Sequence, residues 1–148
     1  MFAIVRPDGW DLPLLVHVAG AMLLVGALVV VVAVTAAAMR RGDDAAVLTR
    51  LAFRGLLIGV LPGYVVMRGG AEWIASEESV GDPAWVGIGY STADGGLLLI
   101  LVATGLAWRA SRRSAGGAGG SARAVMALSA LLIVAYGVAI WAMTAKPS

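Results

Sequence analysis

Four long apolar runs fill most of this chain and leave only short polar stretches between them. The runs lie at about residues 12–38, 51–70, 86–108 and 124–144. Each is close to the roughly 20 residues that an α-helix needs to cross about 30 Å of hydrocarbon. They take up nearly all of the 148 residues, so no room remains for a soluble catalytic domain. The sequence therefore predicts an all-α integral membrane bundle of four transmembrane helices, forming a single domain over residues 1–148.

The composition agrees with a membrane protein and argues against several other classes. Hydrophobic residues make up 60% of the chain and charged residues 14%, with a mean hydropathy of +0.90, whereas soluble domains carry about 25% charged residues. The basic residues are spread over short loops without interleaved aromatics, so we expect no nucleic-acid partner. There is no cysteine, and no serine, lysine and tyrosine set resembles a nucleophilic arrangement. We expect a non-enzymatic protein.

The first apolar run ends in small residues, VTAAAM, which resemble a signal-peptide cleavage site. Its length argues against that interpretation, because the apolar part of a signal peptide spans only about 7 to 15 residues. The stretch before it carries one Arg against two Asp, and Arg40 and Arg41 follow it directly. We therefore expect a retained transmembrane helix.

Arginine is concentrated in the first and third of the loops between the predicted spans. These arginines are Arg40, Arg41, Arg50, Arg109, Arg112, Arg113 and Arg123. The loop between the second and third spans is mainly acidic. By the positive-inside rule, the two arginine-rich loops face the cytoplasm. The sequence thus predicts a multi-pass plasma-membrane protein that is N-out and C-out, with both termini extracytoplasmic.

The second run carries a glycine at every fourth position, at Gly55, Gly59 and Gly63. This makes two overlapping GxxxG patterns, and small residues let membrane helices approach each other closely. We expect this face to press against a neighbouring helix, either of this chain or of a second copy. In the second case the protein would be a homo-oligomer.

Two further residues predict how the first and second runs pack. Pro62 has no N–H and clashes with the carbonyl four residues earlier, that of Ile58, so it should kink the second helix. In the first run, His17 and Gly20 share a face with other small residues at helical spacing. We expect this face to point into the bundle.

Heights along the predicted helices can be counted from their cytoplasmic ends at a rise of about 1.5 Å per residue. This places four polar residues in the outer half of the bundle: His17, Arg68, Glu72 and Asp94. The apolar run after Asp94 is too short to cross the membrane, so this carboxylate must lie in or near hydrocarbon. Burial there costs about 2.5 to 3.5 kcal/mol. Asp94 should therefore be paired, protonated or facing water, and Arg68 lies at the right height to pair with it.

The sequence leaves several roles open for these residues. Ser91 to Asp94 matches a capping box, so Asp94 could instead cap a helix end; a structural Arg68/Asp94 pair and a ligand or proton site are the alternatives. Gly69 and the glycine after it could end the second helix before Glu72. His17 could be a neutral side chain bonded to Glu72, to a carbonyl or to water. It could also accept a proton, contact a ligand, or ligate haem or a metal.

A resident metal is not predicted. Zinc takes three or four ligands from cysteine, histidine and carboxylates, and one histidine, His17, with Glu72 and Asp94 is a weak set. No cofactor is expected either, although a haem could use His17 with Met67, or with His17 of a second copy.

The segment LLVHVAGAMLLVGAL, with His17, Gly20 and Gly26, resembles the opening helix of bacterial copper-resistance-D-like membrane domains and related small four-helix membrane proteins. The resemblance implies a metal- or haem-associated role for His17. Further intramembrane histidines are expected in such relatives, whereas His17 is the single histidine of this chain.

Three functions follow as hypotheses. The leading one is a non-enzymatic membrane protein whose outward cluster of His17, Arg68, Glu72 and Asp94 binds or passes a small solute or proton. The second is a haem- or metal-binding subunit that uses His17. The third is an accessory subunit of a membrane complex in which the cluster is structural.

Overall fold

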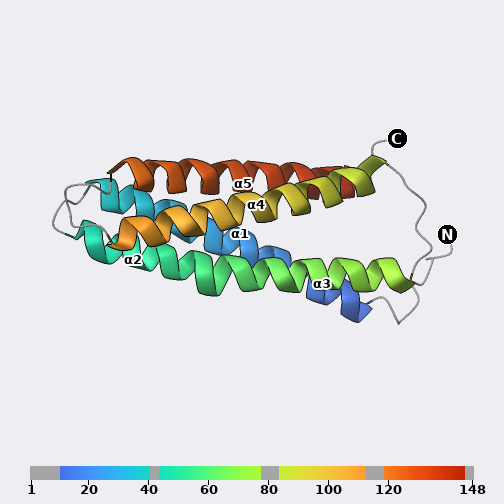
Figure 1. Ribbon diagram of the computed structural model, residues 1–148. Coiled ribbons are helices and arrows are strands. Elements are labelled where there is room, and N and C mark those ends of the chain that lie inside the picture. The colour runs from blue at the N-terminus through green and yellow to red at the C-terminus, as the bar shows by residue number, and fades with distance from the viewer. Residues whose placement is uncertain (1–10, 41–43, 78–83, 113–118, 146–148) are drawn as a thin grey trace.

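The computed structural model describes residues 11–40, 44–77, 84–112 and 119–145. These residues form the helices α1 (Asp11–Arg40), α2 (Ala45–Gly55), η2 (Leu56–Val60), α3 (Leu61–Glu77), α4 (Ala84–Arg112) and α5 (Gly119–Ala145). The segments α2, η2 and α3 run on as one long helix, so the described chain has four helices long and apolar enough to cross a membrane (Figure 1). The predicted all-α bundle of four spans is confirmed.

The helices run up and down, so that α1 begins and α5 ends at the same end of the bundle (Figure 1). We call this the acidic end, after Asp11, Glu72 and Asp94. The opposite end, which carries Arg40, Arg50, Arg54, Arg109 and Arg112, is the arginine end. Along the bundle α1 packs against α3 and α4 packs against α5, whereas α3 barely touches α4.

The core is made of aliphatic side chains from all four spans. Leu24, Leu28, Leu56, Ile100 and Leu132 are fully buried, with 0% exposure. Large apolar side chains also cover the outside of the bundle, and they include Leu15, Met22, Ile58, Leu98 and Val134. Such a continuous apolar exterior is unfavourable in water and suits a lipid environment.

Glycines bring α1 and α3 into backbone contact. Gly20 lies directly against the backbone of Met67, and a Cβ added to Gly63 would lie 2.7 Å from the nitrogen of Leu24. Earlier in the same long helix, Gly55 and Gly59 face side chains of α1. The face formed by Gly55, Gly59 and Gly63 is therefore covered by α1 of the same chain. The sequence left open whether this face packs against a helix of the same chain or of a second copy, and the structure has a helix of the same chain.

The kink at Pro62 stays a prediction; what the structure has just before this proline is a π-helical turn at Leu56–Val60. Leu61 donates its N–H to the carbonyl of Leu56, five residues earlier. Pro62 follows, exposed on the helix surface, and the helix continues beyond it. The helix therefore continues past Pro62 although this residue has no N–H to donate, and the wider turn lies directly before it.

Two helix ends that the sequence left open as alternatives do not occur in the structure. The second span continues through Gly69 and Gly70 to Glu77. Gly70 lies inside this helix where α1 comes closest, since a Cβ there would lie 2.5 Å from the nitrogen of His17. The third span, α4, likewise continues without a break through Ser91 and Asp94, so Asp94 does not cap a helix end. Packing of α4 along α5 overrides the local capping signal.

Candidate functional site

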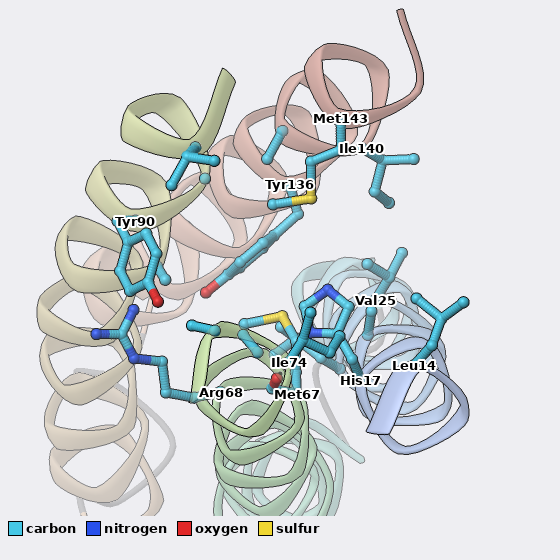
Figure 2. Close-up of a pocket in the computed structure, with 18 residues that line it drawn as sticks. Leu14, His17, Val25, Met67, Arg68, Ile74, Tyr90, Tyr136, Ile140 and Met143 are labelled. Atoms are coloured by element: carbon cyan, nitrogen blue, oxygen red, sulfur yellow. Dashed lines mark hydrogen bonds between the residues drawn. The ribbon is translucent and has the colours of Figure 1, made fainter. Parts of the chain in front are cut away.

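A cavity of about 370 Å³ lies among α1, α3, α4 and α5 in the half of the bundle nearer the acidic end (Figure 2). On α1 its wall extends from Leu14 to Val25, which corresponds to a length of roughly 16 Å at the helical rise. The space exists because α3 and α4 stay apart here while each packs closely on its other neighbour. Small residues such as Ala71, Ala93 and Ala139 line it and leave it unfilled.

The wall of the cavity is almost wholly apolar. Its polar side chains are His17, Arg68, Tyr90 and Tyr136, each from a different helix. Figure 2 shows Arg68 and Tyr90 together on one side of the space and His17 on the other. Most small-molecule sites have this composition, with hydrophobic walls and a few placed polar groups.

Arg68 is held from outside the cavity by two carboxylates. Its Nη2 lies 3.1 Å from Oε1 of Glu72, one helical turn along α3, and 3.5 Å from Oδ1 of Asp94 on α4. The side chains of Glu72 and Asp94 are 54% and 67% exposed, against 27% for Arg68. The guanidinium also lies 4.5 Å from the ring centre of Tyr90. Arg68 thus bridges two helices that otherwise scarcely meet.

His17 does not join this ion-pair cluster. Its Nδ1 lies 2.8 Å from the backbone oxygen of Met67. A carbonyl can only accept, so Nδ1 carries the proton, and in the neutral ring Nε2 is left as an acceptor. A backbone carbonyl was one of the partners that the sequence left open for His17. The predicted cluster therefore separates into Arg68, Glu72 and Asp94 on one side of the cavity and His17 on the other.

Tyr136 is a site residue that sequence reasoning missed. It is only 4% exposed, and its hydroxyl has no hydrogen-bond partner among the described residues. Figure 2 shows this hydroxyl directed toward the side of the cavity that holds Tyr90 and Arg68. A buried hydroxyl left unpaired costs about 1 to 3 kcal/mol. The sequence feature that could have revealed Tyr136 is a tyrosine inside an apolar span, since a buried tyrosine usually requires a partner for its hydroxyl. The same feature marks Tyr90, one turn before Asp94.

Among the described residues of one chain, the donor groups do not form a metal site or a pair of haem ligands. In the described part of the chain, no three side chains from His, Cys, Asp and Glu come together as a metal site. His17 and Met67 lie on adjoining parts of the wall, linked through the Met67 carbonyl, rather than facing each other across a space as two axial ligands must.

The fold and the cavity together define a multi-pass membrane bundle with an apolar cavity between its helices. Comparison of the chain with models of protein families, with curated proteins and with solved structures finds no match. The resemblance to copper-resistance-D-like domains stays a prediction that rests on the first helix.

Proposed function

We propose that this protein binds a small, mostly apolar molecule with one neutral polar group in the cavity between α1, α3, α4 and α5. The observation that carries the proposal is an apolar space of about 370 Å³ whose wall includes Arg68 and Tyr136, a buried tyrosine with no hydrogen-bond partner for its hydroxyl among the described residues. The volume lies within the range of about 300 to 1,000 Å³ that small-molecule sites occupy.

The charges around the cavity favour a neutral polar group over an anion. The single positive charge of Arg68 already faces the two negative charges of Glu72 and Asp94. A third carboxylate would be repelled, whereas a carbonyl or hydroxyl could pair with Arg68 or Tyr136 without adding charge.

The interior favours binding over passage of a solute or proton. Between the cavity and the arginine end, the core is closed by fully buried aliphatic side chains such as Leu28, Leu56 and Ile100. The buried polar residues described in the core are Thr35, Thr49 and Ser129. Thr35 and Thr49 donate their hydroxyls to carbonyls of their own helices. This leaves no continuous chain of polar groups along the described bundle, so a proton would lack a relay.

The orientation is part of the proposal. The arginines of the described helices, apart from Arg68, cluster at the arginine end, which by the positive-inside rule faces the cytoplasm. Both termini and the cavity would then lie on the extracytoplasmic side of the plasma membrane. A ligand would reach the cavity from the outer leaflet or from outside the cell.

Photolabelling in lipid nanodiscs tests the proposal. The probe is a diazirine-bearing octanol, a neutral molecule with one hydroxyl. We expect peptides of the cavity wall containing Ile74 or Met143 to be labelled, and labelling to fall to background in Ala139→Phe, which fills the cavity. Ala139 is buried on the wall. The matched control is Ala130→Phe on the exposed face of α5. Equal wall labelling in both variants, or labelling confined to lipid-facing residues such as Met22, would overturn the proposal.

A further inference from the structure

A second site lies at the opposite end of the bundle, in a cleft of about 640 Å³ between α2 and α4. Its six lining residues are Arg50, Phe53, Arg54, Trp108, Ser111 and Arg112. On each helix they follow the spacing i, i+3, i+4, which places all three on one face. The cleft therefore presents two facing helix surfaces that together carry three guanidinium groups and two aromatic rings.

The three arginines of the cleft have no counter-charge in the described part of the chain. The ion pairs found there within 4.0 Å all involve Arg68, and no carboxylate lines the cleft. Like charges drawn together around one space repel each other, and the repulsion is relieved when an anion enters. This contrasts with Arg68, whose charge two carboxylates already balance.

Trp108 fixes one of the guanidinium groups. The Cζ of Arg112 lies 4.5 Å from the centre of the Trp108 ring. Stacking on the ring leaves the edge of the guanidinium plane, with its N–H groups, open toward an acceptor. Planar forks of N–H groups suit the oxygens of a phosphate, to which arginine can donate two parallel hydrogen bonds. Ser111 contributes no donor, since its hydroxyl already donates to the Trp108 carbonyl.

The surroundings of the cleft match the level of lipid headgroups. Arg112 ends α4, and Trp108, which is 48% exposed one turn earlier, is a residue type enriched at membrane interfaces. The same helix faces continue toward the bundle centre through Leu57 and Leu101, four residues after Phe53 and seven before Trp108, and both are exposed. An anion in the cleft could therefore carry an acyl chain along an apolar path.

We propose that this arginine cleft binds an anionic phosphate group whose charge is not balanced by a cation on the same molecule. The geometry favours the phosphate of an anionic lipid, since the apolar path leads away from the cleft. A free phosphate offers the same chemistry, and the experiment separates the two sources. The site is independent of the cavity at the acidic end.

Lipid retention measured by native mass spectrometry tests the proposal. The protein is released from nanodiscs of phosphatidylcholine mixed with an equal part of phosphatidylglycerol. The site variant is the triple change Arg50→Gln, Arg54→Gln and Arg112→Gln. The matched control, Arg40→Gln with Arg109→Gln and Arg123→Gln, removes the same charge from exposed arginines of the same end that do not line the cleft. The unchanged protein and the control should retain phosphatidylglycerol.

For the site variant, we expect retention to fall at least about a hundredfold relative to the control, since the loss of each charge-assisted hydrogen bond to a phosphate costs about tenfold. Equal loss in both triple variants would mean diffuse attraction and would overturn the site, as would retention in both. If the triple variant does not fold, Arg112→Gln against Arg109→Gln repeats the comparison with an expected loss of about tenfold for Arg112→Gln relative to Arg109→Gln.

Inorganic phosphate added to protein in phosphatidylcholine nanodiscs identifies the source. Arginine-dependent retention of phosphatidylglycerol that inorganic phosphate does not displace assigns the cleft to a lipid. Arginine-dependent binding of inorganic phosphate, with no preference for phosphatidylglycerol, assigns it to a soluble phosphate compound and overturns the lipid preference. Absence of both overturns the proposal as a whole.

Discussion

The two sides of α3 are built in opposite ways. Toward α1, glycines allow the two backbones to touch, at Gly20 against Met67 and at Gly63 against Leu24. Toward α4, the helices stay apart and the cavity lies between them, bridged by Arg68. The difference shows how a small bundle can keep a space between two of its helices. Close packing along one side of a helix holds that helix in place while its other side remains open.

The largest effect is expected where the closed side is forced apart. Gly63→Val places side-chain atoms against the backbone of Leu24, so we expect a loss of about 3 kcal/mol in the free energy of unfolding, the upper part of the overpacking range. The control is Gly69→Val on the same helix, where an added Cβ meets nothing within 4 Å; it should change stability by no more than about 0.5 kcal/mol. Helical circular dichroism during unfolding by SDS in mixed micelles measures both. Similar losses in the two variants would show that the α1–α3 contact is not special.

A smaller effect is expected where the open side loses its bridge. Arg68→Gln removes the link to Asp94 and leaves two carboxylates near each other, but both are more than half exposed. We therefore expect a loss of about 1 kcal/mol that shrinks as salt is added. The same unfolding assay at low and high ionic strength checks this, with Arg109→Gln as the control. A loss that does not respond to salt would contradict an ion-pair role.

The sign of the next effect matters more than its size. Tyr136→Phe removes a buried hydroxyl that has no partner in the described structure. Ligand-free protein should thus be unchanged or more stable by up to about 1 kcal/mol, while labelling by the octanol probe should fall. Ser129→Ala, which removes the other unpaired buried hydroxyl, should match the stability result without affecting labelling. Destabilisation by Tyr136→Phe would mean that the hydroxyl is already satisfied.

The smallest effect is expected for Glu72→Gln. The pair with Arg68 is one turn apart on an exposed helix surface, and such pairs contribute about 0.2 to 0.5 kcal/mol. Thermal unfolding at two salt concentrations measures the change. A loss above about 1 kcal/mol would place Glu72 in a tighter network than the geometry describes.

Hydropathy and helical rise were enough to predict the four spans and the common height of Arg68 and Asp94. Both depend only on local sequence and on the regular geometry of a helix. The helix ends that the sequence left open at Gly69 and at Ser91 are not formed, because glycine and capping signals are only local preferences. Contacts with a neighbouring helix decide such positions, as the approach of Gly70 to His17 shows.

The cavity could not be predicted from the sequence. Its existence depends on how far α3 stands from α4, which no single residue encodes. The sequence left Glu72, a carbonyl or water open as partners of His17, and the structure has the Met67 carbonyl. Helical rise could not decide among them, because it gives the height of a residue and not the direction in which its side chain points. Tyr136 was not recognised as a residue of the cavity wall for the same reason, because its place along α5 does not tell which way its side chain points.

The central claim is that the cavity holds a small neutral molecule. Solvent extraction of protein purified from its membrane, followed by mass spectrometry, tests it most directly in three samples: the unchanged chain, Ala139→Phe and the control Ala130→Phe. We expect one neutral molecule in near-equal molar amount with the unchanged chain and the control, and its loss from Ala139→Phe. The same extracted molecules in the same amounts from all three would contradict it.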